Sequence, residues 1–189
     1  MYWVLVSERS DEYEISIDKV PPIIESHSLY MDQGSFIPDR LPTIDIPFTQ
    51  HIEERKTDNI IVPTRMGLFV NEKVKSIFDK LGIRNIQYFK ARLIQQSTQI
   101  INENYYIANV IGKYACVDHQ ESELEYFDDG DIQFIDKLVL NLEEGNDHGH
   151  IFRLAEFPAL LMISQQLKDI IVDSNITGFK IYNPAEFSL

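Results

Sequence analysis

Clear helix-forming patterns occupy two short segments of the 189-residue chain, beginning at Asn71 and Ser164. Both residues can cap a helix, because their side chains accept a hydrogen bond from a backbone N–H of the first turn. Gly82 is placed to end the first helix. Apolar residues then recur at the spacing of one helical face: Val74, Ile77, Phe78 and Leu81, and Leu167, Ile170 and Ile171. A chain with so little helix must build its core mainly from strands.

Strand-like patterns fill much of the remaining chain. Residues 2–6 are a β-prone run, and residues 13–17 alternate between apolar and polar, so a leading pair of strands is expected. Further strands are expected within residues 84–94, 105–112 and 177–182. The order of these elements predicts an α+β fold, with strand-rich mixed or antiparallel sheets and two or three helices. The length fits one domain spanning residues 1–189.

Residues 19–63 interrupt this regularity. Their prolines are Pro21, Pro22, Pro38, Pro42, Pro47 and Pro63. An irregular connection of this length is unusual in a compact domain and is more often functional or partner-contacting than simple filler. We expect it to wrap the surface on apolar anchors: Phe36, Ile37, Ile44, Ile46 and Phe48.

Composition and charge exclude several classes of protein. A net charge of −13 and a pI near 4.7 argue against nucleic acid as a partner, because phosphates are bound by basic patches. The single cysteine, Cys116, fits a reducing compartment and reads as a buried small apolar residue. No signal peptide pattern is present, and no apolar run approaches the ~20 residues that cross a bilayer. We expect a cytoplasmic protein without a membrane partner. The sequence does not indicate an oligomeric state.

Most of the net negative charge lies between Asp118 and Asp147, where eleven acidic residues face one basic residue. Such a run is often only a solvated face. Here, however, three glutamates alternate, so that in a strand they would share one face opposite Leu124 and Tyr126. Aromatic residues are interleaved with the acids, as an interface core with a charged rim requires. The predicted partner-binding residues are Glu121, Glu123, Glu125, Tyr126, Phe127, Asp128, Asp129, Asp131 and Phe134.

The same region offers an enzymatic alternative. Asp118, His119, His148 and His150, with Asp147 nearby, could serve a metal-dependent hydrolase or a ligand-binding enzyme. The acids around Gly130 lack the spacing of an EF-hand calcium loop. No nucleophile elbow, phosphate-binding loop or dinucleotide fingerprint occurs in the sequence. The prediction is therefore a binding protein without catalytic residues, cofactor or metal.

Several segments resemble the polymorphic-toxin immunity proteins, a family first described as a bacterial domain of unknown function. The segments are GLFVNEKVKSIFDKLG (67–82), YYIANVIGKYACVDHQESE (105–123), IFRLAE (151–156), MISQQLKDII (162–171) and TGFKIYNP (177–184). The resemblance covers the chain from about Ile60 onward and matches the proline-rich part loosely. It implies a protein without catalytic residues that binds a cognate toxin domain and neutralises it by occlusion. An acidic surface suits a basic toxin. An acidic adaptor that binds basic proteins without inhibiting them is a further alternative.

Overall fold

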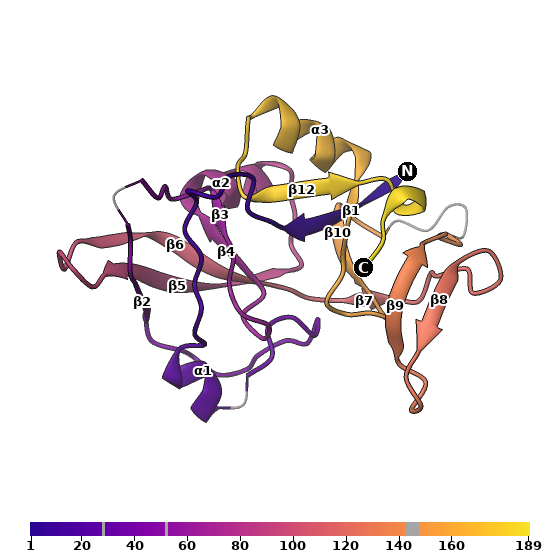
Figure 1. Ribbon diagram of the computed structural model, residues 1–189, viewed down its shortest axis with the longest axis horizontal. Helices are drawn as coiled ribbons and strands as arrows, with labels where there is room; N and C mark the ends of the chain where they lie inside the picture. Colours follow the sequence, from indigo (N-terminus) through magenta and orange to yellow (C-terminus); the bar gives the residue numbers. More distant parts are fainter. Residues whose placement is uncertain (28, 52, 143–147) are drawn as a thin grey trace.

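The computed structural model describes residues 1–27, 29–51, 53–142 and 148–189, which form three β-sheets (Figure 1). The first sheet has the order β12-β1-β11-β10-β7: Phe179–Tyr182, Tyr2–Ser7, Leu161–Ser164, Ile151–Leu154 and Lys113–Tyr114. The second has the order β2-β5-β6-β4-β3: Ile44–Phe48, Ile86–Gln95, Ile101–Val110, Leu68–Asn71 and Asn59–Ile60. The third is a hairpin of β8 and β9: Glu123–Tyr126 and Ile132–Lys137.

Three α-helices lie among the described residues: α1 (Pro22–Ser26), α2 (Glu72–Lys80) and α3 (Gln165–Asp173). A 3-10 turn, η1, follows near the C-terminus (Pro184–Glu186). Both predicted caps are confirmed, since the side chain of Asn71 accepts from the N–H of Val74 and that of Ser164 from the N–H of Leu167, each at 3.2 Å. Most strand pairs are antiparallel, but β2–β5 and β7–β10 are parallel. The predicted α+β class with mixed sheets is confirmed.

Apolar side chains from both larger sheets meet beneath helices α2 and α3. The cluster includes Leu5 and Ile163 of the first sheet, Val110 of the second, Phe78 of α2 and Leu167 of α3. In Figure 1 the two helices lie on the same side of the molecule, above the strands that they cover. This shared core fixes the two larger sheets to each other. A separate cluster joins the hairpin to the first sheet.

The proline-rich segment is more regular than the sequence suggests. It contains strand β2, in which Ile44, Ile46 and Phe48 are buried and alternate with exposed residues. Pro47 is tolerated because β2 lies at the edge of its sheet. The expectation of an irregular connection is therefore wrong for this stretch.

Ile37 is buried, as predicted, but Phe36 is 64% exposed and is not an anchor. The backbone of Ile37 is held on both sides by the amide of Gln87, which accepts from its N–H at 3.0 Å and donates to its carbonyl at 2.6 Å. Of residues 35–37 only Ile37 is buried, since Ser35 and Phe36 are both exposed.

Residues 13–17 do not form the second strand of a leading pair. Ile15 and Ile17 are buried, as their alternation predicts. However, the neighbouring positions make only isolated bridges, from Glu14 to Arg55 and from Ser16 to Ile61. The segment lies along residues 55–61, of which only Asn59 and Ile60 form a strand, and that strand pairs with β4. The predicted alternation holds at Ile15 and Ile17 but fails before them, since Tyr13 is 43% exposed and Glu14 is buried.

Asp58 connects the second sheet, helix α2 and the chain leading into β12. Its carboxylate accepts hydrogen bonds from the Thr177 N–H at 3.0 Å, the Asn71 amide at 2.8 Å and the Lys73 ammonium at 3.1 Å. Burial alone would raise the pKa of Asp58, but these donors outweigh it and the pKa is lowered. Because the pKa of Asp58 is lower in the folded than in the unfolded chain, its stabilising contribution is present above about pH 4 and is lost as the pH falls further.

We predict that Asp58→Asn lowers the free energy of unfolding at pH 7 by about 1 to 3 kcal/mol, because charge-assisted hydrogen bonds are lost. Its loss of stability between about pH 5 and pH 2 should also be smaller than that of the unsubstituted protein. Urea unfolding at a series of pH values measures both effects. Asp39→Asn, at an exposed position, is the control. Equal pH dependence in the Asp58 variant and the unsubstituted protein would contradict the assigned role.

Candidate functional site

The β8–β9 hairpin projects from one end of the molecule (Figure 1). Its inner side is apolar: Ile132 and Ile135 are buried, and Leu124 packs against the same core cluster. The backbone N–H and carbonyl of Ile135 both pair with Leu189, at 3.1 and 2.8 Å. A two-stranded sheet is only marginally stable by itself, so these contacts are what hold the hairpin in place.

The outer side of the hairpin carries acidic residues. Glu123 and Glu125 occupy alternate positions of β8 and are both exposed, as predicted. Glu121, in contrast, lies before the strand. The carboxylate of Asp118 accepts hydrogen bonds from the N–H groups of Gln120 and Glu121, at 3.0 and 3.1 Å. Residues 118–121 therefore form a turn before β8 and are not part of the strand. The predicted row of three glutamates on one strand face is therefore wrong at Glu121.

Three aromatic side chains are exposed on the hairpin: Tyr126 by 46%, Phe127 by 52% and Phe134 by 47%. The register pairs Leu124 with Ile135 and Tyr126 with Ile132, both of which are buried, so Tyr126 shares a face with Leu124, as predicted. Tyr126 is nevertheless 46% exposed at the end of β8. Its hydroxyl lies 2.9 Å from Nδ1 of His119.

The turn that joins the two strands is acidic throughout. The N–H of Phe127 donates to the carbonyl of Asp131 at 2.8 Å, which closes the turn. The carboxylate of Asp129 accepts from the N–H of Asp131 at 3.2 Å. Asp128, Asp129 and Asp131 are all exposed, so the turn extends the acidic surface of the strands.

The sequence prediction missed Asp136, which is exposed on β9 two residues beyond Phe134. The period-two alternation of Phe134 and Asp136 was the signal that could have found it. We define the hairpin surface as the exposed side chains of Glu123, Glu125, Tyr126, Phe127, Asp128, Asp129, Asp131, Phe134 and Asp136.

The acids of the hairpin surface have no cationic partner among the residues that the structure describes. The five ion pairs found there involve Asp11, Asp45, Asp58, Asp79 and Glu8, all on other parts of the chain. Lys137 lies directly opposite Glu123 on the neighbouring strand, but their side chains form no ion pair. Unneutralised carboxylates on one projecting element create a negative field that attracts cationic partners.

The four residues predicted for a metal site are not brought together. Asp118 forms the turn before β8 and His119 contacts Tyr126. His148 packs against aromatic rings, the nearest being Tyr114 at 4.8 Å between ring centres. His150 lies 2.9 Å from the Ser164 hydroxyl. Asp147, Glu143 and Glu144 lie outside the described residues, and within the described part no group of three or more His, Cys, Asp or Glu side chains could hold a metal.

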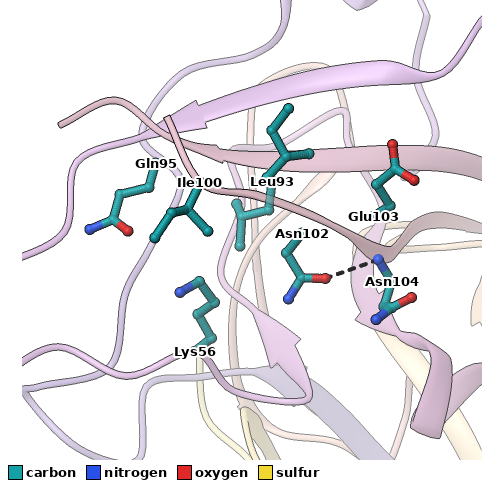
Figure 2. A pocket seen from close by; sticks show the side chains of 8 residues that line it. Lys56, Leu93, Gln95, Ile100, Asn102, Glu103 and Asn104 are labelled. Atoms are coloured by element: carbon teal, nitrogen blue, oxygen red, sulfur yellow. Dashed lines mark hydrogen bonds between the residues drawn. The ribbon is translucent and has the colours of Figure 1, made fainter. Parts of the chain in front are cut away.

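A cavity of about 310 Å³ lies near the turn that joins β5 to β6 (Figure 2). Its charged side chains are Lys56 and Glu103, which lie on opposite sides of it in Figure 2. The carboxamide oxygen of Asn102 accepts from the backbone N–H of Asn104 at 3.0 Å. The two charged side chains lie apart, and the remaining polar side chains of the lining are amides. The cavity therefore offers no adjacent pair of groups for acid–base or nucleophilic chemistry.

Cys116 is 5% exposed, as its sequence neighbours predict. Burial, with a smaller effect of the Glu156 carboxylate, raises the pKa of its thiol to about 12. Since the thiolate is the reactive form, we predict negligible labelling of the folded protein by a thiol reagent at pH 8. The same reagent should label one thiol per chain in denaturant. Rapid labelling under native conditions would contradict the buried position.

Exposed acidic and aromatic side chains on a projecting sheet are the features of a protein–protein interface, whereas catalytic sites are concave. A comparison with protein families gives a consistent result: the model of the Imm11 immunity protein family matches residues 5–186. The chain therefore belongs to the Imm11 immunity protein family. A search of curated proteins gives no match.

The family match confirms the resemblance to toxin-immunity proteins and extends it to the proline-rich segment, which the sequence motifs matched only loosely. Immunity proteins of polymorphic toxin systems have a toxin as partner, and such families are generally non-enzymatic. Among the described residues, no helix is both long enough and apolar enough to span a bilayer.

Proposed function

We propose that this protein binds a cognate bacterial toxin domain through the hairpin surface and neutralises it by covering a site that the toxin needs. The observation that carries the proposal is the combination of three half-exposed aromatic rings with carboxylates that have no ion-pair partner among the described residues, all on one projecting hairpin. Aromatic residues at the centre of an interface provide most of the binding energy, and surrounding charges set specificity and association rate.

The partner that fits this surface is a basic domain. Glu121, although outside strand β8, is exposed beside it and adds to the same negative field. Opposite charges speed the encounter of two proteins, and an inhibitor must reach its toxin before the toxin acts. In this proposal residues 1–189 act as one domain, without catalysis, cofactor or metal, in the cytoplasm of the toxin-producing cell or its kin.

Charge reversal tests the electrostatic part of the proposal. With Glu121, Glu123 and Glu125 changed together to Lys, the association rate constant with the cognate toxin domain should fall several-fold at low salt and less at high salt. Surface plasmon resonance at two salt concentrations measures this difference. The matched control is Glu103→Lys, an exposed strand acid on β6. Equal association rates for the triple variant and the control would remove these acids from the encounter surface.

A general acidic adaptor would bind a basic toxin domain without stopping its activity. The two functions are separated by assaying the toxin domain in the presence of a saturating amount of this protein. The proposed function predicts loss of toxin activity at a one-to-one ratio. Full activity within a stable complex would favour the adaptor.

A further inference from the structure

One backbone edge of strand β8 is unpaired within the described part of the chain. There β8 pairs with β9 alone, whereas β9 is bordered on its other side by Leu189. Apart from this pairing, no backbone group of Glu123–Tyr126 hydrogen-bonds to any residue that the structure describes. Every strand residue carries one backbone donor and one acceptor, and in an edge strand those that point away from the sheet are available to another chain.

The edge strands of the larger sheets are less suited to accept another strand. On one edge of the second sheet, β2 contains Pro47, which lacks an N–H, and on the other β3 has only two residues. In the first sheet β7 also has two residues, and the exposed Lys180 of β12 is engaged by Glu8 at 2.9 Å. Strand β8, with four residues and no ion pair in the described structure, differs from all of these.

The side chains of β8 specify what could pair with it. Glu123 and Glu125 are exposed on its outer face, and Leu124 faces the apolar cluster that contains Ile132 and Ile135. An added strand would place alternate side chains beside the two glutamates and the others on the side of Leu124. Favourable cross-strand pairs therefore require basic residues at every second position, with apolar residues between them.

The same acids disfavour a second copy of this chain. Two β8 strands laid edge to edge would bring their glutamates together, and like charges on neighbouring strands are destabilising. Charged residues on an edge are a common protection against self-association. The same glutamates attract a basic strand. The edge of β8 therefore disfavours a second copy of β8 and favours a strand of opposite charge.

We infer that an extended segment of the cognate toxin domain, with basic and apolar residues in alternation, adds to β8 as a third strand of the hairpin sheet. The inference rests on the proposed function and specifies how the partner is held. Main-chain hydrogen bonds along β8 supply affinity, and Glu123 and Glu125 select the basic side chains. The exposed ring of Phe134 lies opposite Glu125 in the register, on the side of β8 away from the added strand.

Amide hydrogen exchange of the full chain, free and bound to a catalytically inactive form of the cognate toxin domain, tests this inference. We expect the outward-pointing amides within residues 123–126 to exchange at least about tenfold more slowly in the complex, because they become hydrogen-bonded. Amides of the edge strand β12 should exchange at unchanged rates. Intermolecular nuclear Overhauser effects between backbone protons of β8 and of the toxin segment should accompany the protection.

The outcomes separate the inference from the function on which it rests. A complex that inhibits the toxin but leaves exchange in residues 123–126 unchanged overturns strand addition and leaves the proposed function standing. Protection of β8 in the free protein, together with a dimeric mass by light scattering, assigns the edge to a second copy and also overturns it. Failure to form any complex overturns both.

Discussion

Replacing Tyr126, Phe127 and Phe134 together by alanine is expected to weaken binding of the cognate toxin domain by about 100-fold or more. Aromatic residues at the centre of an interface each contribute about 2 kcal/mol or more when they are energetic hot spots, and about 1.4 kcal/mol corresponds to a tenfold change in affinity. The three side chains are about half exposed in the free protein, so their removal should leave the fold intact. Isothermal titration calorimetry measures the affinity, and circular dichroism checks the fold.

The matched control removes equally exposed apolar side chains from elsewhere. Phe36, Ile100 and Ile101 are 64%, 61% and 50% exposed and lie outside the hairpin. Their combined replacement by alanine should change the affinity less than about threefold, as expected for positions outside the interface. If the control variant lost as much affinity as the hairpin variant, the hairpin surface would not be the centre of the interface.

Gly178→Ala is expected to lower the free energy of unfolding by at least about 3 kcal/mol. A Cβ at this position would lie 1.8 Å from the backbone oxygen of Asn59, and its φ of +84° already disfavours any other residue. The Asn59 side chain donates to the Gly178 carbonyl at 2.8 Å, so this close approach joins the second sheet to the start of β12. Urea unfolding followed by fluorescence measures the loss.

Gly82→Ala separates the steric contribution from the backbone conformation. Gly82 has a similar φ of +75°, but no atom lies within 4 Å of the position of its Cβ. Its replacement should therefore cost only the left-handed conformation, about 1 to 2 kcal/mol. Equal losses in the two variants would show that the contact with Asn59 is not tight in solution.

The sequence predicted best what is decided locally. The caps at Asn71 and Ser164, the helices that follow them and the α+β class all depend on residues close together in the chain. Strand β2 was missed because Pro47 and the other prolines of residues 19–63 suggested a loop. The alternation of Ile44, Ile46 and Phe48 was present in the sequence, but an edge position that tolerates Pro47 is a property of the sheet.

Details of the candidate site depended on geometry that the pattern of charges does not contain. The turn at Asp118 removes Glu121 from the strand, and Tyr126 is 46% exposed although the register pairs it with the buried Ile132. Arg153 illustrates the same limit in the core. It is 1% exposed, and its guanidinium donates to the carbonyls of Val110, Pro158 and Met31, two of which come from distant parts of the chain.

The acids of the hairpin surface differ from the other acids of the described structure in how they are paired. The hairpin acids have no cationic partner among the described residues, whereas acids on other parts of the chain, such as Asp45 with Arg92, form ion pairs. A charge that stabilises the fold tends to be paired within it, and an unpaired group on a projecting element is available to a partner. The acidic stretch and the family match therefore support the same function from independent observations.

Survival of cells that produce the cognate toxin domain tests the central claim most directly. Cells should survive when the unsubstituted protein or the control variant at Phe36, Ile100 and Ile101 is co-expressed. They should die when the variant at Tyr126, Phe127 and Phe134 is co-expressed at the same level. Death of cells that contain the unsubstituted protein would contradict immunity, and survival with the hairpin variant would contradict the assignment of neutralisation to the hairpin surface.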